Sequence, residues 1–169
     1  FADALVRSRL GLTGINLEIA VGYRPHGDQN RDLLSVSRLI DLWSLLGVQL
    51  HVTLAFPSSM GKDTEAADHI SVAGESIWRE GWEESSQAHW ASDYVAMLMA
   101  KPQVTGVFWT HFHDGLPHQF PNAGAVRADG RPKPILETLG GQQSRPTAPE
   151  PSSSDSHPMI EDGTWIDEP

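Results

Sequence analysis

The sequence predicts an α/β fold built on a parallel sheet. Three short segments have the apolar character of buried strands, and segments with helical spacing precede, separate and follow them. A regular alternation of helix and strand requires right-handed crossovers between parallel strands. The order fits either an open, doubly wound sheet or part of a closed barrel, and length and order alone leave both open.

The first predicted elements are a short helix and a strand. Residues 2–9 contain good helix formers, and Gly11 is placed to end the helix. Residues 14–23 (GINLEIAVGY) alternate in polarity with a period of two, which is the spacing of a strand. Their aliphatic side chains occupy one side, and Asn16 and Glu18 occupy the other. We therefore expect a strand with an apolar face against helices.

A helix and a second strand follow. In residues 32–47 the apolar side chains recur at helical spacing behind Asp32, a favourable N-cap. Residues 48–56 (VQLHVTLAF) are predicted as the second strand. The polar stretch from there to Gly81 is long for a simple connection, and loops of that length are usually functional or mobile.

The last unit consists of a helix, a strand and a short closing helix. Residues 86–101 have helical spacing and end at Pro102. Residues 104–112 (VTGVFWTHF) are apolar and aromatic and are predicted as the third strand. A loop rich in Gly, Pro and Asn leads to a short helix within residues 132–140.

The end of the chain has a different composition. Beyond Gly140 it is rich in Pro, Ser and acidic residues, so it cannot bury enough apolar surface to fold. We expect one partial domain over residues 1–140 and a disordered acidic tail over residues 141–169. Because the chain opens with Phe1 inside a predicted helix, it is interpreted as the C-terminal part of a longer protein, and any signal peptide would lie upstream.

Charge and composition restrict the class of partner. The formal net charge is −10 without a stripe of Lys and Arg, which argues against nucleic acid or an anionic membrane surface. No apolar run is long enough to span a bilayer. The absence of cysteine excludes disulfides and thiolate metal sites. A neutral ligand such as a sugar is compatible with this composition.

Local strings distinguish between the two architectures. The strings GINLEIAVG, VQLHVTLAF, GVFWTHFHD and ADGRPKPILETL, with the helix at residues 32–47, resemble the end of family-10 glycoside hydrolases, the endo-xylanases. The run Asp129 to Pro134 reproduces the Asp-Gly-x-Pro-Lys-Pro element of that family, in which Asp-Gly makes a turn and proline starts a helix. The resemblance covers roughly residues 1–140. It implies the last three strand-helix units of a TIM-type (β/α)8 barrel.

The resemblance also implies an activity. It suggests a glycosidase that needs no cofactor and hydrolyses a β-linked plant polysaccharide such as xylan, with the rest of the barrel supplied by the upstream chain. The nucleophilic glutamate of the family would follow Thr53, where this chain has Leu54, and the acid/base residue would come from the fourth strand. Retaining hydrolysis needs two carboxylates about 5–5.5 Å apart. A catalytically inactive relative that binds glycans is therefore the alternative.

Candidate site residues follow from the alternation along the strands, because barrels of this type carry their working residues at the carboxyl ends of the strands. We expect Glu18, His51 and Trp109 to face a shared opening. A carboxylate on a buried strand needs partners, so Glu18 is the candidate catalytic residue, unless it accepts a substrate hydroxyl or pairs with a cation in the barrel floor. The candidate substrate-binding residues are Asn16, His51, Trp109, His111, His113 and Asp114.

Three of these residues have a competing interpretation. A ring such as Trp109 offers a flat apolar face to a pyranose, and we favour this contact over the alternative that the ring fills the core. The pair His111 and His113 resembles the metal sites of metallo-β-lactamase-like hydrolases and amidohydrolases, since two imidazoles at that spacing can share one ion. Gly115 and Leu116 stand where the metallo-β-lactamase string needs Asp and His. A metal-dependent hydrolase is accordingly the third hypothesis, and our preferred reading contains no metal.

Overall fold

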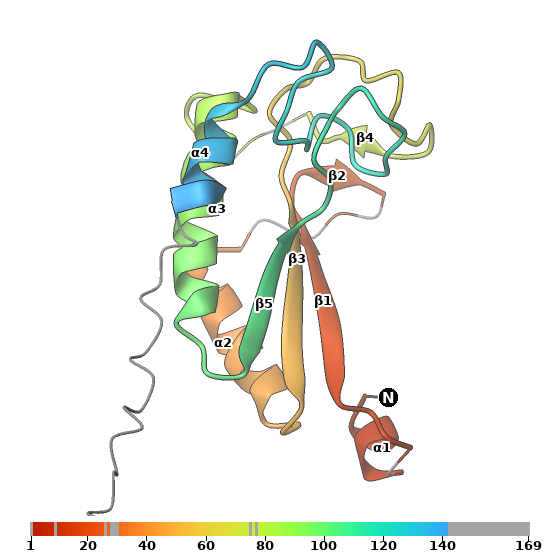
Figure 1. The fold of residues 1–169 in the computed structure, drawn as a ribbon, viewed down its shortest axis with the longest axis vertical. Coiled ribbons are helices and arrows are strands. Elements are labelled where there is room, and N and C mark those ends of the chain that lie inside the picture. The colour runs from red at the N-terminus through yellow and green to blue at the C-terminus, as the bar shows by residue number, and fades with distance from the viewer. Residues whose placement is uncertain are drawn as a thin grey trace, which may run out of the picture.

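The computed structural model describes residues 2–8, 10–25, 27, 31–74, 76 and 78–141 of the chain. The predicted disordered tail, from residue 142 on, lies outside the described residues. In chain order the elements are α1 (Ala2–Arg7), β1 (Gly14–Ala20), β2 (Tyr23–Arg24), α2 (Leu33–Ser44), β3 (Gln49–Ala55), β4 (Ser71–Val72), α3 (Glu84–Met99), β5 (Val104–Trp109) and α4 (Pro134–Gly141). Figure 1 shows three strands side by side, with three of the labelled helices, α2, α3 and α4, on one side of them and α1 at the foot of the first strand.

The main sheet has the order β1-β3-β5, and both strand pairs are parallel. Helix α2 connects β1 to β3, and helix α3 connects β3 to β5. The α/β fold predicted from the sequence is therefore confirmed. We call the face of the sheet opposite these helices the bare face, because no described helix packs against it (Figure 1).

The helix-facing side of the sheet carries the main hydrophobic core. Leu54 is fully buried there, and Trp109 is its neighbour in the register of β5. Helix α3 supplies Trp90 and Tyr94, whose rings stack with centroids 4.2 Å apart. Such large rings bury much apolar surface and dominate the energy of a core. The core thus fixes α3 against β3 and β5.

Helix α2 begins as the sequence predicts. Asp32 is its N-cap, and the Asp32 carboxylate accepts hydrogen bonds from the backbone N of Ser35 at 2.7 Å and from the Ser35 hydroxyl at 3.1 Å. These bonds lower the pKa of Asp32 below its ordinary value. Val36 and Ile40 form the buried stripe of the helix. Capping and amphipathic spacing together explain why this helix was predictable.

Loops gather at the carboxyl ends of the three strands (Figure 1). The short strands β2 and β4 pair there in antiparallel fashion. Beside them lies a second, smaller core formed by buried residues of the strand ends and the loops: Ala20, Tyr23, Ala55, Ile70, Phe120 and Ala123. The Tyr23 hydroxyl donates to the carbonyl of Pro121 at 3.2 Å. This second core holds the loops in place over the sheet.

None of the helices in the described part of the chain has the length and apolar character that crossing a membrane requires.

Candidate functional site

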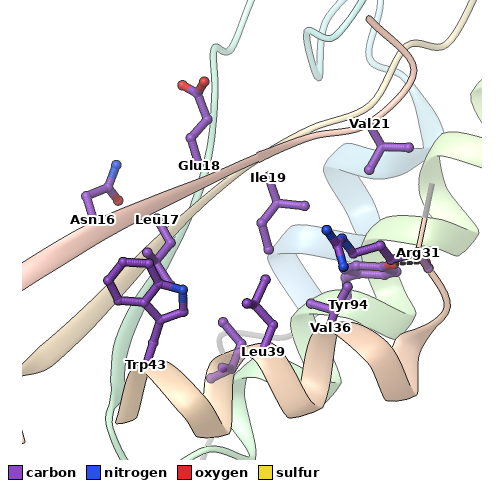
Figure 2. Close-up of a pocket in the computed structure, with 11 residues that line it drawn as sticks. Asn16, Leu17, Glu18, Ile19, Val21, Arg31, Val36, Leu39, Trp43 and Tyr94 are labelled. Atoms are coloured by element: carbon purple, nitrogen blue, oxygen red, sulfur yellow. Dashed lines mark hydrogen bonds between the residues drawn. The ribbon is translucent and has the colours of Figure 1, made fainter. Parts of the chain in front are cut away.

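The bare face carries the polar row predicted on the first strand. Figure 2 shows Asn16 and Glu18 pointing away from α2, whereas Leu17 points toward it. The Thr53 hydroxyl of β3 donates to Oδ1 of Asn16 at 3.1 Å, and His51 is the register partner of Asn16. The predicted common face of Asn16, Glu18 and His51 is confirmed by this register. Their role in binding or catalysis stays a prediction.

The expectation that Glu18 is buried is wrong. Glu18 is exposed, as are Asn16 and His51. The reason is that no described segment covers this part of the bare face, so the polar row lies open to solvent. An exposed carboxylate needs no partner to offset a cost of burial.

The prediction that Trp109 shares this face is also wrong. Trp109 lies on the helix side, where its ring contacts Trp90 at a centroid distance of 6.2 Å and its indole N–H donates to the carbonyl of Ala123. The cause is a β-bulge in β5. Leu50 pairs with Val104 but His51 pairs with Gly106, so Thr105 is an extra residue. A one-residue shift moves every following side chain to the opposite face.

The aromatic residue that the bulge turns onto the bare face is Phe108. It is half exposed and is the register partner of Thr53. Its ring meets the His51 ring edge-on, with centroids 5.5 Å apart. The sequence does contain this phenylalanine, but counting alternate positions along a regular strand assigns it to the helix side. Phe108 is therefore a candidate site residue that the sequence analysis missed.

The position of the predicted nucleophile has a structural explanation too. Leu54 is fully buried and faces the helices, so a carboxylate at this position would not reach the bare face. Its neighbours Thr53 and Ala55 alternate onto the bare face. Neither is a carboxylate. Strand β3 therefore offers no nucleophile of the kind that retaining glycosidases use.

Asp114 is the centre of a buried polar cluster in the loop after β5. Its Oδ1 accepts from the backbone N of Gly124 at 2.7 Å and from Nε2 of His111 at 3.1 Å, and its Oδ2 lies 2.5 Å from Nζ of Lys133. Burial alone would raise the pKa of Asp114, but the hydrogen bonds from His111 and Lys133 and the lysine charge outweigh it and lower the pKa to about 2. Asp114 is thus a carboxylate at neutral pH.

Lys133 shows what the DGRPKP element does. Its ammonium group is buried and donates to Asp114, to the Ser58 hydroxyl at 2.8 Å and to the carbonyl of Asn122 at 3.2 Å. These three bonds use all three of its N–H donors. The element therefore ties the start of α4 to the loops after β3 and β5. The cluster adjoins a polar cavity of about 270 Å³ between these loops.

His113 is not brought to His111 as the metal hypothesis requires. The group of described residues whose possible ligand atoms lie within 4.8 Å of one another is His111, Asp114 and His118. The Nδ1 of His113 instead accepts a hydrogen bond from the backbone N of Gly115 at 2.8 Å. His118 was missed in the sequence because it lies in an irregular loop, where spacing carries no signal.

Comparison with known proteins finds similarity to this chain in fold and not in sequence. No protein-family model matches the chain, and no curated protein matches its sequence. Among solved structures it is similar to xylanase 10B from Thermotoga petrophila RKU-1, in complex with xylobiose, with a TM-score of 0.55 and 17% identity over 82% of this chain and 38% of that one. It is also similar to the β-glucuronidase of Bifidobacterium dentium, with a TM-score of 0.54 and 16% identity over 78% of this chain and 20% of that one.

A third likeness, to native xylanase 10B from Thermotoga maritima, has a TM-score of 0.52 and 18% identity and covers 83% of this chain and 40% of that one. The chain thus spans two fifths or less of the length of these three neighbours. The described units form the C-terminal part of a TIM-type (β/α)8 barrel, and these neighbours with the same fold are glycoside hydrolases. In that barrel the helices lie outside, so the bare face is the side toward the barrel axis.

Proposed function

We propose that this chain belongs to a glycoside hydrolase that cleaves a β-linked plant polysaccharide such as xylan. The observation that supports this most is Glu18, which stands beside Asn16 and His51 on the face directed toward the barrel axis. Among the described residues of the three main strands, Glu18 is the carboxylate on that face. Glycosidases act through pairs of carboxylates, and Glu18 would supply one of them.

The second carboxylate would come from a strand that this chain does not contain. Three parallel strands cannot close a barrel, so we propose that the preceding strand-helix units complete it. An apolar groove of about 260 Å³ runs beside β1 and is lined by Leu17, Ile19, Leu39 and Trp43 among others (Figure 2). Apolar surface of this kind gains free energy when another element covers it. The groove is therefore a suitable seat for the preceding unit.

The substrate class follows from the chemistry of the axis-facing residues. The Asn16 amide and the His51 ring can both donate and accept hydrogen bonds, as sugar hydroxyls do. The exposed face of Phe108 offers an apolar surface for the C–H side of a pyranose. A neutral sugar chain fits this combination better than a charged polymer would.

The test is the activity of the longest natural chain that contains this sequence. Release of reducing sugar from xylan, and of the leaving group from aryl β-xylosides and β-glucuronides, is measured for wild type, for Glu18→Gln and for Glu137→Gln, an exposed glutamate of α4 that serves as the matched control. Loss of a catalytic acid or base lowers kcat by about 10²–10⁴-fold, so Glu18→Gln should lose activity at unchanged KM. Equal activity of the two variants would exclude a catalytic role for Glu18.

A second candidate function is glycan binding without hydrolysis. The observation that favours it is the lack of a carboxylate at the axis-facing positions Thr53 and Ala55 of β3. In that case the wild-type chain binds xylo-oligosaccharides in calorimetric titration but releases no reducing sugar. Phe108→Ala then weakens binding, whereas Glu18→Gln has a small effect.

A further inference from the structure

Two imidazoles and two carboxylates form a buried cluster at the carboxyl end of the sheet. We call Asp63, His111, Asp114 and His118 the imidazole clasp. The side chain of His118 is 2% exposed and that of Asp63 is 6% exposed, while His111 and Asp114 are 13% and 10% exposed. Asp63 belongs to the loop after β3, and the other three belong to the loop after β5. The clasp therefore joins two loops that are far apart in sequence.

His118 lies between two hydrogen-bond acceptors. Its Nδ1 lies 2.7 Å from the carbonyl oxygen of Leu116, and its Nε2 lies 3.0 Å from Oδ2 of Asp63. Both partners accept hydrogen bonds and neither can donate one. A neutral imidazole has a single N–H, so one of its nitrogens would direct a lone pair at an oxygen. Only the imidazolium form donates to both.

We propose that His118 is held as an imidazolium and that this proton holds the loop after β3 to the loop after β5. Without the proton, one of the two contacts becomes repulsive inside a buried site. Loss of a buried hydrogen bond to a charged group is costly, because neither partner can turn to water. A single proton therefore holds the two loops of the imidazole clasp together.

The charges that surround His118 support this protonation state. Asp63 and Asp114 contribute two negative charges, and Lys133 compensates one of them through Asp114. Burial lowers the pKa of His111 against the opposing hydrogen bond to Asp114, and the neighbouring His118 acts in the same direction as burial, which favours the neutral form of His111. Burial raises the pKa of Tyr23 well above its usual value, and the nearby Asp114 and Asp63 add to that rise. A proton on His118 therefore compensates the remaining negative charge.

A shared metal ion fits the geometry less well than a proton does. The rings of His111 and His118 are stacked, with centroids 4.1 Å apart and planes 12° from parallel. An imidazole nitrogen directs its lone pair within the plane of its ring, so two stacked and nearly parallel rings cannot aim at one ion. Oδ1 of Asp114 already accepts from His111 and Gly124. The cluster satisfies itself without an added cation.

The consequence of the proton reaches the loops above the strands. The backbone of His118 donates to the carbonyl of Glu65 at 3.1 Å and accepts from the N–H of Ala67 at 3.0 Å. Oδ2 of Asp63 also accepts from the backbone N of Asn122 at 2.8 Å. A shift of the His118 ring therefore releases backbone hydrogen bonds on both sides. We expect these loops to open as pH rises, while the sheet stays intact.

The test measures amide hydrogen exchange by mass spectrometry on the longest natural chain that contains this sequence, between about pH 5.5 and about 8.5, where imidazoles titrate. After correction for intrinsic exchange, protection of peptides spanning residues 61–68 and 116–123 should fall about tenfold as pH rises, as expected for loss of one charge-assisted hydrogen bond. Peptides of α3 should keep their protection. Exchange at the ring C2–H reports the protonation of each histidine directly, and at pH 7 His118 should be charged.

The variants separate the clasp from a merely structural histidine. His118→Gln should show loop protection that no longer depends on pH, and His89→Gln, the matched exposed control, should behave as wild type. Asp63→Asn provides a second test if His118→Gln does not fold. A neutral His118 at pH 7, or loop protection in wild type that is the same at both ends of the range, overturns the proposal. So does added zinc chloride that protects the loops of wild type but not of His118→Gln, because the cluster would then be a metal site.

Discussion

Loss of the ion pair between Asp114 and Lys133 should strongly lower the free energy of unfolding. Replacement of Asp114 by Asn leaves the buried ammonium of Lys133 without its counter-charge, and breaking a buried pair in this way costs about 3 kcal/mol. Urea unfolding at pH 7 of the longest natural chain that contains this sequence, as wild type and as Asp114→Asn, measures the difference. A loss within experimental error would mean that solvent reaches the pair.

The same carboxylate makes stability depend on pH at the acid end. The pKa of Asp114 in the fold, about 2, lies below its ordinary value of 3.8. Its contribution is therefore complete above the ordinary value and is lost as pH falls through about 2. The lowered pKa corresponds to a stability on the order of 2 kcal/mol. The difference in unfolding free energy between wild type and Asp114→Asn should shrink between pH 5 and 2, and a constant difference would contradict this assignment.

Replacement of two neighbouring aromatic residues on β5 should lower stability by different amounts. Trp109→Ala removes a ring from the core and should cost about 3 kcal/mol of stability. Phe108→Ala removes a half-exposed ring from the bare face and should change stability by less than about 1 kcal/mol. Thermal unfolding distinguishes the two variants. Equal costs would place both rings in the same environment.

At the scale of elements, local patterns explain most of what the sequence predicted. Alternation, N-capping and helical spacing are properties of neighbouring residues, so β1, α2 and β3 were predictable. The bulge at Thr105 was not, because it arises from the pairing of β5 with β3, and that pairing is a long-range contact. The two-residue strands β2 and β4 are likewise set by each other and carry no pattern of their own.

The candidate site residues divide in the same way, into those set by local patterns and those set by long-range contacts. Asn16, Glu18 and His51 lie on one face because β1 and β3 pair without a shift, which simple alternation anticipates. Trp109 was assigned to the wrong face because of the bulge, and His118 was not found because loop geometry brings it to His111 and Asp63. Residues on regular strands could be predicted, and residues placed by loops could not.

At the scale of the whole molecule, the open sheet predicts poor behaviour of the isolated domain. The outer edges of β1 and β5 have no strand partner in the sheet of the described residues, and exposed parallel edges promote association. Residues 1–140 expressed alone should therefore aggregate or form large oligomers in size-exclusion chromatography with light scattering. A monomer with a cooperative thermal transition would contradict this expectation.

The extra residue in β5 also constrains any redesign of this barrel. Side chains before Thr105 and side chains after it alternate in opposite phase between the two faces of the sheet. A library that selects axis-facing positions by simple alternation would therefore randomise the hydrophobic core beneath the helices instead. Deleting Thr105 would turn every following side chain of the strand to the opposite face. The indole of Trp109 would then face the barrel axis, and the ring of Phe108 would enter the hydrophobic core. A single residue thus decides which aromatic ring a bound sugar would contact.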